Sequence, residues 1–213
     1  MDEDTQRQAI VETVKRLQES GFNHGSSGNV SCRTSGGMLI TPTGANSANL
    51  TPSRLVHVGP DGSAVGGVPS SEWHMHEAIL RAHPAANAVV HTHADACVAL
   101  SCLRKPLPPF HYMVAAFGGT DVRCARYEIF GTADLGAAAV EALRDRNACL
   151  LANHGMIAIG KTLEAAFQTT VKLETLARQY LMALQGGEPV LLPDEEMARV
   201  ARRYGNYGTG PLK

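Results

Sequence analysis

The stretch AVVHTHA (residues 88–94) carries the strongest single indication of the fold and of a functional site. Its apolar residues favour a strand over Ala88–His93, built from the valines that buried strands prefer. Residues two apart on a strand project from the same face, so His91 and His93 could both reach one metal ion. Two histidines can also meet at a sheet edge by chance, and the pair alone leaves a metal-binding and a structural interpretation equally open.

A second apolar run ends in another histidine. LANHG (residues 151–155) follows a strand predicted over Ala148–Ala152 and precedes one over Met156–Ile159. The turn at His154-Gly155 would present its side chains at the end of the sheet. Alone, His154 would be read as a surface residue, but together with the HTH pair it predicts a three-histidine zinc centre of the catalytic type.

The remaining periodic segments surround these strands with helices. Apolar residues three and four apart predict helices, and alternating residues predict strands. The predicted helices are Asp4–Ser20, Trp73–His83, Asp95–Leu103, Thr132–Arg146, Thr162–Gly186 and Glu195–Arg203, and the further strands are Asn29–Arg33, Met38–Thr41 and Leu55–Val58. We expect Ser70-Ser71 to cap the second helix. Without a regular βαβ alternation, an α+β domain or a layered α/β/α domain with a mixed sheet fits best.

Composition excludes several classes of function. The chain has 213 residues, a net charge of −1 and a pI near 6.7, so nothing predicts a nucleic-acid or membrane surface. The length suits one domain spanning residues 1–213, with a glycine-rich, mobile tail at Tyr204–Lys213. Five scattered cysteines with no CxxC pair, and an acidic N-terminus without a signal-peptide core, favour the cytoplasm.

Glu72 is the fourth candidate at the metal centre. It lies at the start of the predicted second helix, where a carboxylate interacts favourably with the helix dipole and often has no other role. A functional role requires that its side chain face the metal. There it could bind the ion while no substrate is present, and then leave it and accept a proton.

Three short polar stretches could hold a phosphate group. They are Ser26–Asn29, Thr41–Gly44 and Ser70-Ser71, and they combine small hydroxyls with backbone N–H groups and a helix start. Each stretch alone is more often an ordinary turn or cap. No GxxxxGK[ST] loop or strand-linked GxGxxG is present, so nucleotide binding through those motifs is unsupported. His74 and His76 lie two apart on a helix, on nearly opposite faces, and are not expected to share an ion.

Six linked motifs resemble the class II sugar-phosphate aldolases, most strongly the L-fuculose-1-phosphate aldolases. The motifs are GNVSCR (28–33), ITPTG (40–44), PSSEWHMH (69–76), AVVHTHA (88–94), HYMVAAFGG (111–119) and LANHG (151–155). Their order and spacing agree with that family from the first helix to the long last helix. The resemblance implies a mixed, mainly antiparallel sheet flanked by helices, a zinc cofactor and a homotetramer with active sites at subunit interfaces.

The resemblance also implies a role for individual residues. His91, His93 and His154 match the zinc histidines, and Glu72 matches a glutamate that is both zinc ligand and acid/base. The positions that match the phosphate site are Gly28, Asn29, Thr43, Gly44, Ser70 and Ser71. Tyr112, an ordinary aromatic without this resemblance, matches a tyrosine that reaches a neighbouring active site. Phe130, Tyr204 and Tyr207 fall near the aldehyde end.

The implied reaction is the reversible cleavage of a ketose 1-phosphate to dihydroxyacetone phosphate and a small aldehyde such as lactaldehyde. The zinc ion would act as Lewis acid, Tyr112 would handle the proton of the C4 hydroxyl, and Glu72 the proton on the C3 side. The tail leaves 5-deoxyribulose or 5-methylthioribulose 1-phosphate open as the substrate. A sugar-phosphate 4-epimerase, a 3-oxo-tetronate phosphate decarboxylase and a non-catalytic adducin-like domain resemble the same scaffold and also stay open.

Overall fold

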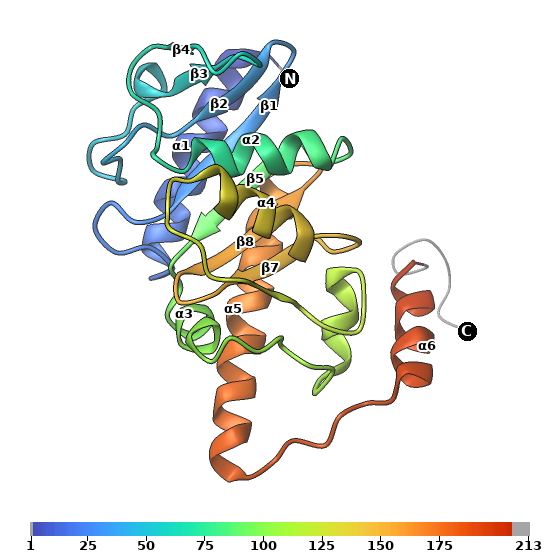
Figure 1. The fold of residues 1–213 in the computed structure, drawn as a ribbon. Coiled ribbons are helices and arrows are strands. Elements are labelled where there is room, and N and C mark those ends of the chain that lie inside the picture. The colour runs from blue at the N-terminus through green and yellow to red at the C-terminus, as the bar shows by residue number, and fades with distance from the viewer. Residues whose placement is uncertain (1, 206–213) are drawn as a thin grey trace.

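One mixed sheet of eight strands runs through the computed structural model, which describes residues 2–205 (Figure 1). The strand order is β4-β3-β2-β1-β5-β8-β7-β6. All neighbouring strands are antiparallel except β6 and β7, which are parallel. The strands are β1 (Asn29–Thr34), β2 (Gly37–Ile40), β3 (Val56–Val58), β4 (Ala64–Val65), β5 (Ala88–Thr92), β6 (Cys124–Ala125), β7 (Ala148–Leu151) and β8 (Gly155–Gly160). The predicted mainly antiparallel sheet is confirmed.

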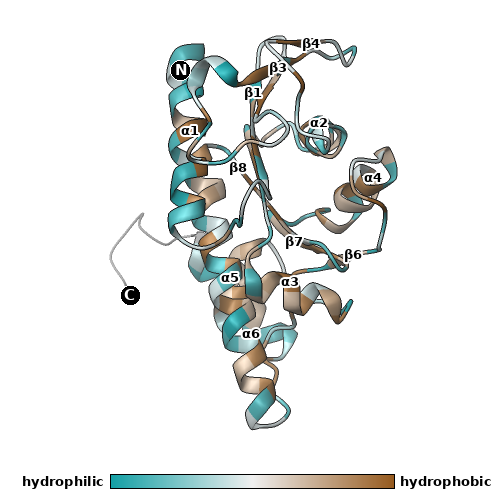
Figure 2. Cartoon of the chain, turned by 90° about the vertical axis from the view of Figure 1, so that its left-hand side faces the viewer, coloured by the Kyte–Doolittle hydropathy of each residue, from teal (hydrophilic) through white to brown (hydrophobic). Residues whose placement is uncertain are grey.

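Helices cover both faces of this sheet and give the expected α/β/α layers (Figure 2). Helices α1 (Glu3–Glu19), α3 (Asp95–Cys102) and α5 (Leu163–Gly186) lie on one side. On the other side α2 (Trp73–Ala82) packs against α4 (Ala133–Ala142). Two 3-10 turns, η1 (Pro52–Arg54) and η2 (Tyr112–Phe117), and a last helix, α6 (Asp194–Gly205), complete the described chain.

A hydrophobic cluster lies on each face of the sheet, and the strands divide their side chains between the two. On β5, Ala88 and Val90 belong to the cluster under α1 and α5, whereas Val89 belongs to the cluster under α2 and α4. Because side chains alternate along a strand, His91 shares the face of Val89. The histidines of the HTH motif therefore face the layer of α2 and α4.

The start of α2 differs from the prediction. The helix begins at Trp73, as expected, but its N-cap residue is Glu72 and no side chain caps it. Ser70 instead accepts a hydrogen bond of 3.4 Å from the Glu72 backbone N–H, one residue before the helix. The assignment of Ser70-Ser71 as caps was therefore wrong. The side chain at the cap position is turned toward the histidines instead of back onto the helix.

Other differences concern short or terminal elements. The two-residue strands β4 and β6 and the turn η2 were not predicted, and α4 ends at Ala142 instead of Arg146. Thr132 and Thr162 cap α4 and α5 as predicted. Tyr207 and most of the predicted mobile tail lie outside the described residues. Within residues 2–205, no helix has the length and hydropathy that crossing a bilayer would require.

Candidate metal centre and substrate pocket

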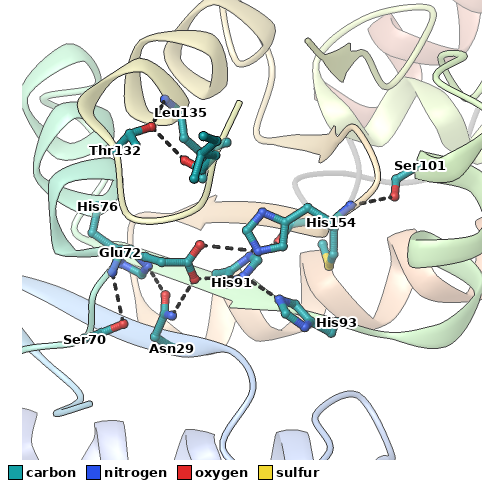
Figure 3. Close-up of polar contacts among 12 residues, drawn as sticks. Asn29, Ser70, Glu72, His76, His91, His93, Ser101, Thr132, Leu135 and His154 are labelled. Carbon is teal, nitrogen blue, oxygen red and sulfur yellow. Dashed lines mark hydrogen bonds and ion pairs between the residues drawn. The ribbon is translucent and has the colours of Figure 1, made fainter. Parts of the chain in front are cut away.

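Three imidazole rings meet at one end of the sheet in a nearly threefold arrangement (Figure 3). The ring centroids of His91, His93 and His154 are 4.9 Å apart in every pair, and every pair of planes makes an angle of 75°. One ring nitrogen from each histidine lies within 4.8 Å of the others. The structure thus brings together all three histidines selected from the sequence, in the form that a single ion requires.

The antiparallel strands account for this convergence. His91 lies on β5, paired with Ile157 on β8 and with Asn29 on β1, and His93 follows directly after β5. His154 belongs to the tight turn between β7 and β8. Because β5 and β8 run antiparallel, the end of β5 lies beside the start of β8, where that turn is located.

Gly155 allows the turn to approach β5 closely. A Cβ atom at this position would lie 2.4 Å from the carbonyl oxygen of Thr92 and 3.1 Å from Cδ2 of His93. No side chain fits in that space without displacing backbone. The preceding Asn153 adopts a left-handed conformation with φ of 53°, which asparagine tolerates better than most residues.

The tautomer of His91 leaves a nitrogen available for a metal. Its Nδ1 is 2.9 Å from the carbonyl oxygen of Met156, and this nitrogen therefore carries the proton and donates. In the neutral ring, Nε2 then has a free lone pair, and it lies 3.0 Å from Nε2 of His93. A backbone carbonyl in this position is the usual partner that orients a metal-binding histidine.

Glu72 completes the cluster from the other side. Its Oε2 lies 3.2 Å from Nε2 of His91, and its Oε1 lies 3.3 Å from Nε2 of His154. The residue is only 6% exposed, and Oε1 has no hydrogen-bond partner. A buried carboxylate oxygen without a hydrogen bond, beside three imidazoles, fits a divalent cation, and this set of nitrogen and oxygen donors suits Zn²⁺.

The pKa values reflect how tightly these groups are packed. Burial alone would raise the pKa of Glu72, but charge on His91 and hydrogen bonds from His91 and Asn29 outweigh it and hold that pKa well below its usual range. Burial lowers the pKa of His93 and of His154 to about 4, and charge on His91 adds to the effect. Near neutral pH the site therefore holds an ionised carboxylate beside neutral imidazoles of His93 and His154. Burial alone would lower the pKa of His91, but the Glu72 carboxylate outweighs it and raises that pKa, so His91 must give up a proton when a metal binds.

A pocket of about 400 Å³ opens beside this cluster. Glu72, His93 and His154 line it, and so do residues from all three candidate phosphate stretches. They include Ser26, Ser27, Gly28, Asn29, Thr43, Gly44, Ser70 and Ser71. Stretches far apart in the sequence, which alone would be read as ordinary turns, thus lie around one cavity next to the metal candidates.

The pocket wall is polar but carries no positive side chain. No lysine or arginine is among the described residues that line it. Gly28 and Gly44 have φ angles of 75° and 68°, and such left-handed turns direct backbone N–H groups into concave anion sites. An anion bound here would depend on hydroxyl and amide donors.

Of the aromatic residues that the resemblance places near the active site, some line the pocket of their own chain and others do not. Phe130 lines the pocket and is 67% exposed. Tyr112, on η2, is 51% exposed, stacks on His111 and is not among the residues that line the pocket. Tyr204 packs against the hydrophobic cluster under α1 and α5. Within one subunit, only Phe130 of these three reaches the candidate site.

The structure adds residues that the sequence interpretation left out. Tyr127 and Glu128 also line the pocket, next to Phe130, but a loop without periodicity gives no sign of this. His76 is fully buried and bonds to Asn29, whereas His74 is exposed and stacks on Trp73. The prediction that these two histidines share no ion agrees with their opposite faces. A sign that His76 lies near Glu72 was available, because the two residues are four apart and so share one helix face.

Fold and site together define an α/β/α protein with a buried three-histidine, one-carboxylate centre beside a polar pocket. More particularly, the chain belongs to the class II aldolase and adducin N-terminal domain family, whose model matches residues 8–181. It is 46% identical over 203 residues to a 5-methylthioribulose-1-phosphate/5-deoxyribulose-1-phosphate aldolase of Rhodospirillum rubrum, covering 95% of this chain and 92% of that protein.

Two further similarities agree with this family. The chain is 44% identical over 201 residues to the L-fuculose phosphate aldolase of Escherichia coli K12, covering 93% of this chain and 94% of the relative. A solved structure of an L-fuculose 1-phosphate aldolase superposes with a TM-score of 0.89 at 38% identity, covering 93% of this chain and 95% of that one. The protein is thus a class II aldolase, as its motifs predict, and therefore an enzyme of the carbon–carbon lyase type.

Proposed function

We propose that this enzyme is a zinc-dependent aldolase that reversibly cleaves a ketose 1-phosphate to dihydroxyacetone phosphate and a small aldehyde. One observation carries the proposal: Glu72 and two of the three clustered histidines line the same pocket as residues from all three candidate phosphate stretches. A ketose 1-phosphate needs both features, because its phosphate must be held while negative charge develops beside its carbonyl.

His91, His93 and His154 would hold the zinc ion, with Glu72 as a fourth ligand in the absence of substrate. When bound, zinc would supply Lewis-acid stabilisation of the negative charge that forms beside the carbonyl. Glu72 can then leave the metal and transfer the proton on the C3 side. Its Oε1, which has no hydrogen bond, is the oxygen suited to that step.

The proton of the C4 hydroxyl is assigned to Tyr112 of a neighbouring subunit in a homotetramer. The exposure of Tyr112 and its absence from the pocket of its own chain support this assignment. A phenol that served its own site would have to lie beside the histidines. The proposed enzyme therefore has active sites at subunit contacts and functions in the cytoplasm, where its five cysteines would stay reduced.

We assign phosphate binding to the neutral wall of the pocket, formed by Gly28, Asn29, Thr43, Gly44, Ser70 and Ser71. Two kinds of aldehyde remain open for the other half of the substrate. L-Fuculose 1-phosphate would release lactaldehyde, whereas 5-deoxyribulose or 5-methylthioribulose 1-phosphate would release an aldehyde with a different end group. The 46% identity to an aldolase named for the latter pair, and the aromatic rings of Tyr127 and Phe130 at the pocket, favour testing those substrates equally.

A panel of substrates tests this function. Zinc-loaded protein is incubated with L-fuculose 1-phosphate, 5-deoxyribulose 1-phosphate and 5-methylthioribulose 1-phosphate, and dihydroxyacetone phosphate is measured by a coupled assay. We expect release from at least one of them and none from His93→Ala. If none of the three is cleaved, the aldolase proposal fails. Epimerised ribulose 5-phosphate would then identify an epimerase, carbon dioxide from a 3-oxo-tetronate phosphate would identify a decarboxylase, and no turnover at all would favour the adducin-like role.

A further inference from the structure

A chain of buried hydrogen bonds runs from Ser31 on the sheet to the carboxylate of Glu72, and Figure 3 shows its part from His76 through Asn29 to Glu72. Ser31 Oγ is 2.7 Å from His76 Nδ1, and His76 Nε2 is 2.5 Å from Asn29 Oδ1. Asn29 Nδ2 in turn donates to Glu72 Oε2 at 2.9 Å. Ser31 and His76 are fully buried, and Asn29 and Glu72 are each 6% exposed, so water does not compete for these groups.

The positions of the four residues follow from two sequence spacings. Asn29 and Ser31 are two apart on β1 and so face the same side of the sheet. Glu72 and His76 are four apart at the start of α2 and so face the same side of the helix. The two pairs face each other, and His76 lies between both residues of the β1 pair.

The direction of every hydrogen bond in this chain is determined. An ionised carboxylate only accepts, so Asn29 must turn its NH₂ group toward Glu72 and its carbonyl oxygen toward His76. His76 must then donate from Nε2. Burial holds the pKa of His76 down, to about 3, so the ring is neutral and its Nδ1 can only accept, from the Ser31 hydroxyl.

We propose that His76 is a positioning residue that fixes the amide of Asn29, and through it the carboxylate of Glu72, in the orientation that catalysis uses. The inference rests on the role of Glu72 in the proposed function. With Oε2 anchored by Asn29, the second oxygen, Oε1, is the one left without a hydrogen bond and directed to His154.

Loss of the His76 donor would release the amide of Asn29. An amide turned by half a revolution would place Oδ1 against Glu72 Oε2, and two acceptors at that distance repel each other. The carboxylate would then move away from its position between His91 and His154. Zinc affinity and turnover would both decrease, although no metal ligand has been changed.

Two substitutions of similar polarity separate this role from a merely structural one. In His76→Gln, the side-chain amide nitrogen can occupy the place of Nε2 and still donate to Asn29. In His76→Asn, the side chain is shorter and its amide nitrogen reaches only the place of Nδ1. We expect His76→Gln to keep kcat and zinc affinity within about threefold of wild type. We expect His76→Asn to lose about 10–100-fold in both, the range for residues that orient metal ligands. Equal losses in both variants, or a loss in neither, would overturn the proposal.

A measurement on the unsubstituted protein covers the case in which His76→Asn does not fold. Nitrogen-15 NMR of the imidazole distinguishes a protonated Nε2 from a protonated Nδ1. We expect His76 to carry its proton on Nε2 between about pH 6 and 8, above the range in which this ring titrates. A proton on Nδ1 would overturn the proposal. Neither this measurement nor zinc affinity needs a substrate, so an unreactive wild type would count against the aldolase function alone.

Discussion

At the scale of single residues, the site depends on how Glu72 and the three histidines share a small space. Each imidazole directs one nitrogen to the same point, and the carboxylate approaches from the layer of α2. In the proposed function the carboxylate is both a metal ligand and a proton carrier, and a substitution that removes its charge tests the second of these roles.

Glu72→Gln should keep the fold and lose most of the turnover. The amide is nearly isosteric with the carboxylate but cannot accept the proton, and general acid–base groups typically contribute about 10²–10⁴-fold to the rate. We expect kcat to fall by about that factor while circular dichroism and melting stay close to those of the wild type. Steady-state kinetics of the zinc-loaded variant measures the effect. Turnover near that of the wild type would remove Glu72 from the acid/base role.

His93→Ala should lose the metal, whereas His74→Ala should keep it. His93 supplies one of the three converging nitrogens, but His74 is exposed and stacks on Trp73. Since changes outside the ligand set already cost about 10–100-fold in metal affinity, loss of a ligand should cost at least about 100-fold. Zinc content after dialysis measures both variants. Unchanged zinc in His93→Ala would show that the ion binds elsewhere.

At the scale of elements, the turn between β7 and β8 decides whether the histidines can meet. Gly155→Ala would push a methyl group against the carbonyl of Thr92 and the ring of His93. We expect a loss of about 1–3 kcal/mol in unfolding free energy, as for other overpacked sites, together with weaker zinc binding. Gly186→Ala is the matched control, because nothing lies within 4 Å of its Cβ position. Chemical denaturation that ranked the two variants equally would contradict this account.

The elements also show which features a sequence can predict. The helices and the longer strands were predicted closely, because amphipathic periods extend over enough residues to be recognised. β4 and β6, with two residues each, are too short to show a period, and they form because a neighbouring strand offers backbone partners. Local rules assigned Ser70-Ser71 as caps, whereas tertiary contacts gave the cap position to Glu72.

At the candidate site too, features set by the local sequence could be predicted, whereas contacts between distant segments could not. HTH and NHG could be found because each ends a recognisable strand, and alternation along a strand places both HTH histidines on one face. The hydrogen bonds of His76 could not be predicted because its partners, Asn29 and Ser31, lie on a strand 47 and 45 positions away. Contacts between distant segments depend on strand order, which the sequence did not reveal.

At the scale of the whole molecule, complementation between subunits tests where Tyr112 acts. Tyr112→Phe and Glu72→Gln should each be nearly inactive, since each removes one part of the proposed shared site. When they are co-expressed in equal amounts and assembled at random, about one site in four receives both intact residues. We expect activity to recover to about that fraction in the mixed assembly, measured beside each variant alone. No recovery would place Tyr112 in the site of its own chain or outside any site.

The stability of the whole molecule should depend on pH through His76. Burial lowers its folded pKa from 6.5 to about 3, so the unfolded chain binds more protons between those values. The neutral His76 ring therefore makes its full contribution to the free energy of unfolding above about pH 6.5. As the pH falls below that value, the free energy of unfolding decreases by up to about 1.4 kcal/mol per pH unit. In metal-free protein, the free energy of unfolding of His76→Gln should decrease less between about pH 6 and 4 than that of the wild type, as measured by denaturant titrations. Parallel curves for the two proteins would contradict this linkage.

The short distance between Nε2 of His91 and Nε2 of His93 affects how the proposed zinc ion would be taken up. Two neutral nitrogens facing each other at 3.0 Å repel unless a hydrogen lies between them. Protein stripped by a chelator should therefore carry a hydrogen there on Nε2 of His91, in addition to the one on its Nδ1, because the Glu72 carboxylate outweighs burial and raises the pKa of His91. The incoming cation must then release that proton into solvent. The heat of zinc uptake would then change with the ionisation enthalpy of the buffer, and acidification alone would drive the cation out again.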